Sequence, residues 1–313
     1  MSLILKKVSM LVICLSLLLG GNVSALASSG NGSNDAAVID ELWGVPILAY
    51  GASLSASQLD EVKAILDVRD GSFDSVAVDG YDLVYFLGRG NSNASMFSSV
   101  LITRREAGSG VFVAILTPEN ITRVTEIQYA NAMITAGVTD ALVEVASPIP
   151  VTGEAALTGI YKAFYERGIE FDSDRMEVAQ EELELTSSIA IYHEDNEDFD
   201  QSNLDHAIID IKSNLAEIYY SAGVIANDEQ VQEVIREALI ENDLDDIVTP
   251  EQALRMANFA QSFQLTDAIN SPELREQLSD LANRVESILE NVTREEALGW
   301  FHRIVNFFRR IFN

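Results

Sequence analysis

The stretch VPILAYGASLSASQLDEVKAIL, residues 45–66, indicates how this chain folds. Its first six residues form a short apolar run, which predicts a strand. Ser55 and Gln58 then form a capping box, the pattern that marks the start of a helix. Apolar residues follow at helical spacing at Leu59, Val62, Ile65 and Leu66. A strand that leads directly into a helix is the building unit of α/β proteins.

The same alternation continues to about residue 170. Further strands are predicted at 73–78, 96–103, 110–117 and 141–146, and helices at 82–87, 125–137 and 154–166. The strands at 96–103 and 110–117 flank a short segment that contains Gly108, which predicts a β-hairpin. We therefore expect residues 43–170 to form an α/β domain with a mixed sheet of about five strands.

Residues 171–296 carry no strand pattern and are predicted to form a helical domain. Thr249, Pro250 and Gln252 together give an N-cap, a first-turn proline and a capping box. The next predicted helix begins at Ser271 and has the apolar stripe Leu274, Leu278, Leu281, Val285 and Ile288. Thr293 and Glu296 predict the cap of a last helix.

An acidic connector, residues 194–205 (EDNEDFDQSNLD), lies within this helical region. Clustered carboxylates suit calcium, but with Asp198 in the first position of a calcium loop the required Gly and Glu are replaced by Asn203 and Ile209. We therefore favour a solvated loop in which Asn203 or Asp205 caps the next helix. The sequence predicts no metal site and no cofactor.

The N-terminus has the pattern of a secretory signal peptide. Two lysines precede the apolar run 8–19, and an Ala-Leu-Ala site ends at Ala27. The alternative is an uncleaved anchor, but the run is about half the ~20 residues that a membrane-spanning helix needs. We expect export with cleavage after Ala27, which removes Cys14, the only cysteine, and leaves residues 28–42 as a flexible linker.

The chain is strongly acidic, with 49 Asp and Glu against 20 Lys and Arg and a net charge of −29. Nucleic-acid binding needs clustered basic side chains, so we predict no nucleic-acid partner. Hydrophobic residues make up 48% of the chain, which is typical of a folded protein and excludes extensive disorder.

The tail, residues 297–313, contrasts with this acidic body because it has three arginines and no acid. On a helix its apolar side chains would form one broad face, and Arg303 and Arg310 would share one side. This pattern predicts an amphipathic helix that contacts an anionic membrane or cell-wall polymer. The predicted contact residues are Trp300, Phe301, Arg303, Ile304, Phe307, Phe308, Arg309, Arg310 and Phe312. The alternatives are that the tail packs on the helical domain, or on the acidic body of its own or another copy.

Three stretches resemble the YpuA-like family of predicted secreted proteins of Gram-positive bacteria, a domain of unknown function. They are Gly51-Ala-Ser-Leu-Ser55, Tyr129-Ala-Asn-Ala132 with Thr135-Ala-Gly137, and Ser147-Pro-Ile-Pro-Val-Thr-Gly-Glu-Ala-Ala-Leu-Thr-Gly159. The resemblance extends over residues 45–211 and more loosely to 263. Ser53 departs from the family pattern, in which an acidic residue is usual. The resemblance implies export and supplies no catalytic residues.

The strand-to-helix turns are the best candidates for a small site. Ser53 and Ser55 follow the first predicted strand, and Thr152 and Gly153 follow the fifth. In open α/β sheets ligands favour the carboxyl ends of strands, and helix N-termini attract anions. The alternative is that Ser55 and Thr152 only cap helices and Gly153 eases a turn.

No arrangement of residues typical of hydrolytic enzymes stands out. The three histidines lie at 193, 206 and 302, none of them in the α/β region, and neither Gly-x-Ser-x-Gly nor His-Glu-x-x-His occurs. We therefore predict a secreted, envelope-associated protein with a non-enzymatic binding or structural role. The alternatives are an envelope enzyme with paired carboxylates, such as a carbohydrate hydrolase, or a module that binds an anion or peptide at the strand-to-helix turns. The ligand and the oligomeric state are left open.

Overall fold

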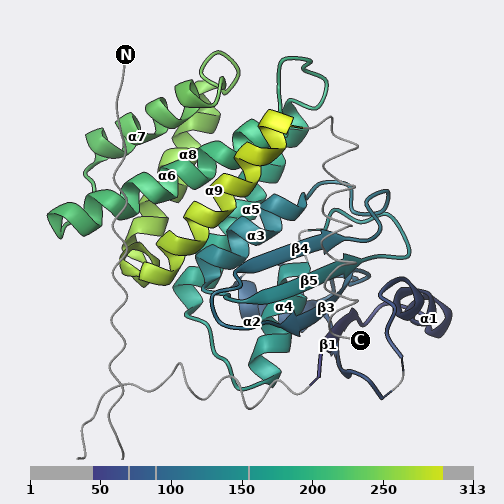
Figure 1. Ribbon diagram of the computed structural model, residues 1–313. Helices are drawn as coiled ribbons and strands as arrows, with labels where there is room; N and C mark the ends of the chain where they lie inside the picture. Colours follow the sequence, from purple (N-terminus) through teal and green to yellow (C-terminus); the bar gives the residue numbers. More distant parts are fainter. Residues whose placement is uncertain (1–44, 70, 89, 154–155, 292–313) are drawn as a thin grey trace, which may run out of the picture. The chain divides into compact units, whose positions relative to one another are not determined.

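The computed structural model describes residues 45–291, apart from residues 70, 89, 154 and 155 (Figure 1). The predicted signal peptide, linker and tail lie outside these residues, as does the predicted cap at Thr293. Within the described part of the chain, no helix combines the length and the apolar character needed to cross a membrane.

Strands and helices alternate in the first half. The order is β1 (Ile47–Gly51), α1 (Ala56–Ile65), β2 (Asp74–Val78), α2 (Gly80–Leu87), β3 (Ser99–Arg104), β4 (Val111–Ile115), α3 (Glu126–Ala136), β5 (Ala141–Ala146) and α4 (Ala156–Glu166). Helices follow: α5 (Ser173–Tyr192), α6 (Gln201–Ala222), α7 (Asp228–Glu241), α8 (Pro250–Leu265), a short 3-10 helix (Asp267–Asn270) and α9 (Pro272–Asn291). The predicted fold class, α/β followed by helices, is confirmed.

The five strands form one mixed sheet in the order β2-β1-β3-β5-β4. β1 runs parallel to β2, and β4 runs parallel to β5. β3 lies between these two pairs and is antiparallel to both neighbours, β1 and β5. The sheet is therefore two parallel pairs joined by one reversed strand.

The predicted hairpin between the third and fourth strands is wrong, because β5 lies between β3 and β4. The connecting loop, residues 105–110, crosses the start of β5 and is anchored there on Asp140. The Arg105 N–H donates to the Asp140 carbonyl at 2.7 Å, and the Gly110 N–H donates to its carboxylate at 2.9 Å. Six residues can span up to about 20 Å, enough to pass two strand spacings of about 5 Å each.

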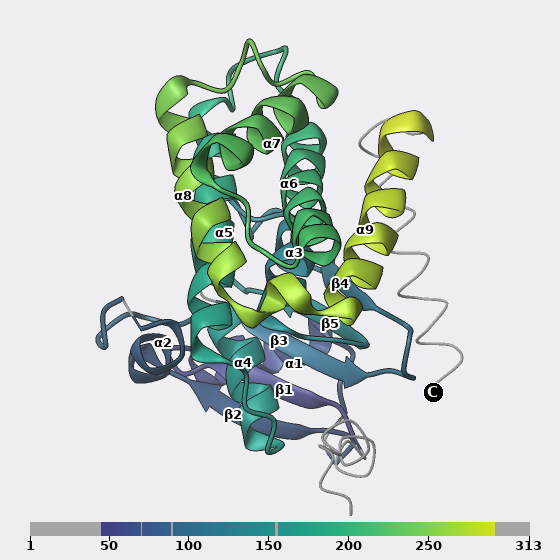
Figure 2. The ribbon, with the colours of Figure 1, turned by 90° about the vertical axis from the view of Figure 1, so that its left-hand side faces the viewer.

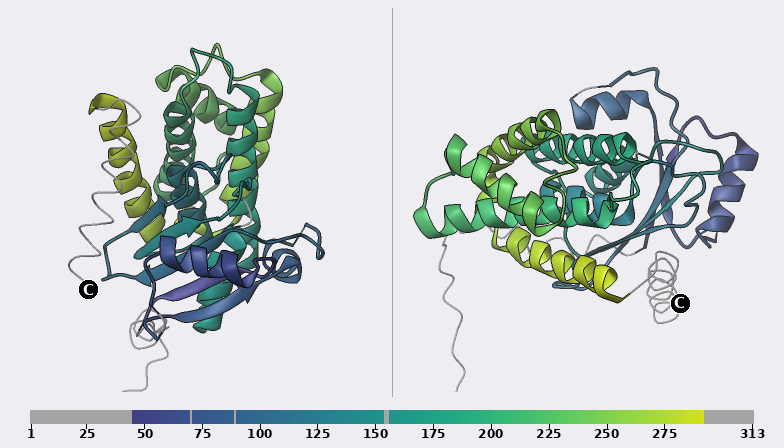
Figure 3. Two further views of the ribbon diagram at one scale, coloured as in Figure 1. Left: turned by 90° about the vertical axis from the view of Figure 1, so that its right-hand side faces the viewer. Right: turned by 90° about the horizontal axis from the view of Figure 1, so that it is seen from above.

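The two faces of the sheet are covered differently. The main face carries Ile47, Val100, Ile102, Val143 and Val113, with α3 and α4 packed directly on it. The opposite face, the α1 face, carries Leu48, Leu101, Glu144, Ala114 and Leu142. Figure 3 shows α1 on one side of the sheet and α2, α3, α4 and α5 on the other.

Helix α3 is the centre of the molecule. All of its residues are buried, because the sheet lies on one side and α5, α6 and α9 pack on the other (Figure 2). One continuous hydrophobic cluster runs from the main face of the sheet through α3 to α9. The core therefore crosses the predicted boundary at residue 170.

The local helix signals are confirmed where the structure describes them. Full capping boxes form at Ser55, Thr125 and Thr249, and Gly137 ends α3 in the left-handed conformation. The α9 stripe is buried at Leu274, Leu278, Leu281 and Val285.

The N-cap of α6 is a different residue from those predicted in the acidic connector. Asp200 caps α6 by accepting a hydrogen bond from the Ser202 N–H at 2.8 Å. Asn203 and Asp205 both lie inside the helix, and Asp205 is buried. The predicted cap at Asn203 or Asp205 is therefore wrong, because tertiary burial of Asp205 leaves the exposed Asp200 to begin the helix.

Candidate functional site

The predicted turns lie at one end of the sheet. β1 and β5 are both antiparallel to β3, so they run in the same direction and their carboxyl ends meet at the same edge. Ser53 follows β1, and Thr152 and Gly153 follow β5. β3 separates the two turns, so the structure brings them to one edge without making them neighbours.

The turn after β1 is closed by its own chain. The Ser53 hydroxyl accepts a hydrogen bond from the Met96 N–H at 3.0 Å, and the Ser53 N–H donates to the Met96 carbonyl at 3.1 Å. A Cβ on Gly51 would come within 2.2 Å of that same carbonyl oxygen, and a Cβ on Gly80 within 2.3 Å of the Ser92 carbonyl oxygen. Residues 92–96 therefore lie directly against the carboxyl ends of β1 and β2. Ser55 caps α1.

The turn after β5 is also held internally. The Thr152 carbonyl accepts from the Arg123 N–H at 3.2 Å, and the Gly153 carbonyl accepts from the Tyr129 hydroxyl. Gly153 has a φ of +100°, and a Cβ there would lie 2.8 Å from the Tyr129 hydroxyl. The Tyr129–Gly153 contact joins two of the stretches that carry the family resemblance. Ligand binding at Ser53, Ser55, Thr152 and Gly153 stays a prediction.

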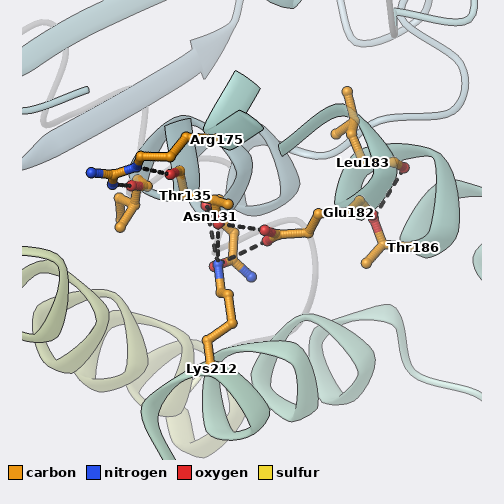
Figure 4. Close-up of polar contacts among 8 residues, drawn as sticks. Asn131, Thr135, Arg175, Glu182, Leu183, Thr186 and Lys212 are labelled. Atoms are coloured by element: carbon orange, nitrogen blue, oxygen red, sulfur yellow. Dashed lines mark hydrogen bonds and ion pairs between the residues drawn. The ribbon is translucent and has the colours of Figure 1, made fainter. Parts of the chain in front are cut away.

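The most concentrated group of polar side chains lies around Lys212, between α3, α5 and α6 (Figure 4). The Lys212 side chain is 0% exposed, and its Nζ atom is 2.9 Å from Glu182 Oε1. Nζ also donates to the Thr135 hydroxyl at 2.9 Å and to the carbonyl and side-chain oxygens of Asn131. We call Asn131, Thr135, Glu182 and Lys212 the buried network.

The buried network balances charge and hydrogen bonds. Burial lowers the pKa of Lys212, while the nearby Glu182 carboxylate acts in the opposite direction. The Thr135 hydroxyl accepts from Lys212 and donates to Glu182 Oε2 at 2.5 Å. The three N–H groups of an ammonium therefore all have acceptors, which is the condition for burying a charged lysine.

The C-terminal end of α3 is held by Arg175 of α5. Its guanidinium donates to the Thr135 carbonyl at 2.8 Å and to the Ile134 carbonyl at 3.2 Å. Burial lowers the pKa of Arg175, although Asp267, 3.5 Å away, opposes this. A positive charge here satisfies the last carbonyls of α3 and complements the helix dipole.

The N-terminal end of α3 is held by two buried carboxyl groups. Asp205 of α6 accepts a hydrogen bond from the Thr125 hydroxyl at 3.1 Å, and burial raises its pKa to about 8. Glu126 accepts from the Ile115 N–H at 2.8 Å, and burial raises its pKa to about 7. Both groups hold protons at a higher pH than exposed carboxyls do.

These groups position α3. One groove of 830 Å³ lies beside Ile225 and Leu265, and another of 230 Å³ lies beside Phe112 and Arg284. Neither is lined by the buried network, Arg175, Asp205 or Glu126. Among the described residues, no three His, Cys, Asp or Glu side chains are grouped as a metal site requires.

The histidines in the described residues also have structural partners. The buried His193 lies 3.0 Å from the Gln252 side-chain oxygen and stacks on Phe199. His206 Nδ1 lies 2.8 Å from the Asn242 side-chain oxygen. Both side chains join helices of the helical region.

The buried network was missed from the sequence, although two signals for it exist. Lys212 lies on the apolar stripe of α6 with Ile208, Ile211 and Leu215, where a charged side chain would be buried. Asn131 and Thr135 belong to the stretch Tyr129–Gly137 that carries the family resemblance. The first signal indicates a buried lysine that needs acceptors, but neither signal links Lys212 to Asn131 or Thr135.

Comparison with known proteins identifies the family of this chain and a relative in Bacillus subtilis. Residues 50–281 match the family described as "Protein of unknown function (DUF1002)". The chain is 29% identical over 279 residues to "Uncharacterized protein YpuA" of Bacillus subtilis (strain 168), and the alignment covers 88% of this chain and 89% of that protein. No solved structure matches the chain.

Proposed function

We propose that this chain, which belongs to the DUF1002 family of proteins of unknown function, is exported and has a non-enzymatic binding or structural role at the cell envelope. The observation that carries the role is the burial of its unusual ionisable groups. Lys212 and Glu182 are 0% and 1% exposed, and each is hydrogen-bonded within the buried network. A substrate would have to unfold the packing of α3, α5 and α6 to reach them.

The buried groups instead support a rigid scaffold. Asp205, Lys212 and Arg175 contact the start, the middle and the end of α3 from two other helices. Fixing one central helix at three points joins the sheet to the helical region. A rigid body of this kind suits a protein that presents surfaces rather than one that opens for catalysis.

The envelope location rests on the two ends of the sequence. Residues 1–27 have the pattern of a signal peptide, and residues 28–296 carry all 49 acidic side chains against 15 basic ones. The tail, residues 297–313, carries three arginines and the aromatic side chains expected of an interfacial helix. We propose that the tail contacts an anionic membrane surface.

Co-sedimentation tests the envelope contact. The mature chain, residues 28–313, is mixed with vesicles of phosphatidylglycerol and phosphatidylcholine, beside residues 28–296 and the charge-reversed variant Arg309→Glu/Arg310→Glu. Pelleting of residues 28–313 alone, weakened by salt, is expected because the attraction is electrostatic and interfacial. Vesicles of phosphatidylcholine alone are the control. Equal pelleting of all three proteins, or of none, would contradict the proposed contact.

A further inference from the structure

The α1 face of the sheet carries two apolar clusters, and the half-buried Leu116 packs against both. In the first cluster, α1 packs Val62 and Leu66 against Leu48, Leu101 and Ala146. The second cluster, which we call the β4–β5 patch, consists of Ala114 and Leu142 with the half-buried Phe112 and Leu116. Its members all come from β4 and β5 or the residue after β4, so no described helix contributes to it.

The β4–β5 patch is buried all the same. Leu142 is 5% exposed, Ala114 is 1% exposed, and Glu144, the partner of Ala114 in the sheet, is 3% exposed. A sheet whose strands are apolar on both faces needs a layer on each. Of the described helices, α1 is the one on this face (Figure 3), and it lies over β1 and β3. The layer beside it is incomplete in the described part of the chain.

The middle of α9 passes the edge of this patch. β4 is an edge strand of the sheet, and Arg284 of α9 donates to the Val111 carbonyl at 3.0 Å. Its guanidinium carbon also lies 4.6 Å from the centre of the Phe112 ring, on the α1 face. α9 ends at Asn291, and its C-terminal end points away from the sheet in Figure 2. The five residues between α9 and the tail can span up to about 17 Å.

The tail has the dimensions and chemistry to cover the patch. As a helix, residues 297–313 would be about 25 Å long, compared with about 20 Å for a strand of six residues. Its aromatic and aliphatic side chains match the apolar Phe112, Leu116 and Leu142. Arg303 and Arg310 would share one side of this helix.

We propose that residues 297–313 dock on the β4–β5 patch and complete the helical layer beside α1. This inference rests on the proposed function in one respect: the aromatic side chains that cover the patch are those proposed to contact a membrane. Docking and membrane contact therefore exclude one another, and the docked tail is the state of the protein away from a membrane.

Thiol labelling tests the docking. The mature chain has no cysteine, so Leu116→Cys introduces a single probe on the patch. We expect labelling at least about tenfold faster in residues 28–296 than in residues 28–313, the ratio for a site that the tail covers about nine-tenths of the time. Leu254→Cys, at a 63% exposed position on α8, is the control and should label equally in both. Equal rates at Leu116→Cys in the two proteins would overturn the proposal.

Trp300 gives a second measurement that needs no truncation. The chain has two tryptophans, so Trp43→Phe leaves Trp300 as the only one. A docked tail predicts blue-shifted emission and weak quenching by acrylamide in buffer, compared with the same protein in guanidinium. Emission and quenching that match the unfolded protein would contradict docking. Protection that appears only as the protein concentration rises would contradict docking within one chain, since it would indicate a second copy.

The two proposals can fail separately. If Leu116→Cys is protected in residues 28–313 and the protein does not pellet with anionic vesicles, docking stands and the envelope contact fails. If the protein pellets but the tail gives no protection in buffer, the envelope contact stands and docking fails. Faster labelling of Leu116→Cys on adding anionic vesicles supports both, because the tail must then leave the patch.

Discussion

The two faces of the sheet show two ways of stabilising one layer. The main face is covered by helices whose central member, α3, is fixed by Asp205, Lys212 and Arg175. On the α1 face, α1 is the one covering helix among the described residues, and it is held there by apolar contacts. The difference teaches that buried ionisable groups are concentrated around α3, where the sheet lies on one side and α5 and α6 pack on the other. There, a polar contact can fix one helix relative to both of its neighbours.

The largest expected effect is on the main face, at Lys212. Lys212→Met leaves Glu182 buried without its cation, and we expect the free energy of unfolding to fall by about 3–5 kcal/mol. The double variant Lys212→Met/Glu182→Leu should recover most of this loss, because it removes both charges. Urea unfolding of the mature protein measures both. A loss below about 1 kcal/mol for the single variant would show that the buried network contributes little.

A smaller effect is expected at Leu142 on the α1 face. Leu142→Ala should cost about 2–3 kcal/mol in residues 28–313, in the lower range for a buried leucine, and clearly less in residues 28–296. Val143→Ala is the matched control because the neighbouring side chain points to the main face and should cost the same in both proteins. An equal loss of stability at Leu142→Ala in both proteins would contradict the idea that the tail covers the α1 face.

The main face should also make the free energy of unfolding depend on pH. Glu126 and Asp205 have pKa values raised by burial to about 7 and about 8, so the folded protein holds protons that the unfolded chain releases. Their contribution to stability is present at low pH and is lost as the pH rises from about 4 towards those values, by at most about 1.4 kcal/mol per pH unit for each group.

The variant Asp205→Asn should flatten this dependence. Urea unfolding midpoints of Asp205→Asn and the parent protein are compared from pH 5 to pH 8. Asp245→Asn, at an exposed position in the loop after α7, is the matched control and should keep the parent slope. An identical slope in Asp205→Asn would mean that Asp205 is ionised in the folded protein throughout this range.

The smallest effects compare two helix caps. Ser55→Ala removes the cap of α1 and should cost about 0.5–1 kcal/mol. Thr125→Ala removes the cap of α3 and the donor to the buried Asp205, and it should cost about 2 kcal/mol. Thermal unfolding of both variants gives the ranking. Equal costs would indicate that the Thr125–Asp205 hydrogen bond adds nothing to the cap.

The sequence predicted interactions between residues close together in the chain but not those between residues far apart. The capping boxes at Ser55, Thr125 and Thr249 involve residues three apart, and all of them form. The order of the strands depends on contacts far apart in sequence, and the hairpin prediction failed because loop 105–110 instead spans β5 through Asp140. Local signals identified the elements of the sheet but not their neighbours.

The polar groups show the same limit, because their positions could be predicted from local sequence but their partners could not. Ser53 and Thr152 were correctly placed after their strands, but their partners, Met96 and Arg123, come from other loops and could not be identified from the turns. Lys212 and Asn131 are 81 positions apart. The apolar stripe of α6 indicates that Lys212 is buried, but nothing in the sequence connects Lys212 with Asn131, so the pair becomes visible only once α3 and α6 are packed together.

Native-state hydrogen exchange tests the contrast between the two faces most directly. Amides of α3, residues 126–136, and of α1, residues 56–65, are compared in the mature protein by mass spectrometry at increasing concentrations of urea. We predict that α3 amides exchange only with global unfolding, because the helix is buried and fixed at both ends and its middle. We predict that α1 amides exchange through local opening at a lower free energy. Exchange of α3 at the same or a lower free energy than α1 would contradict the claim that its contacts with Asp205, Lys212 and Arg175 make α3 the fixed centre of the molecule.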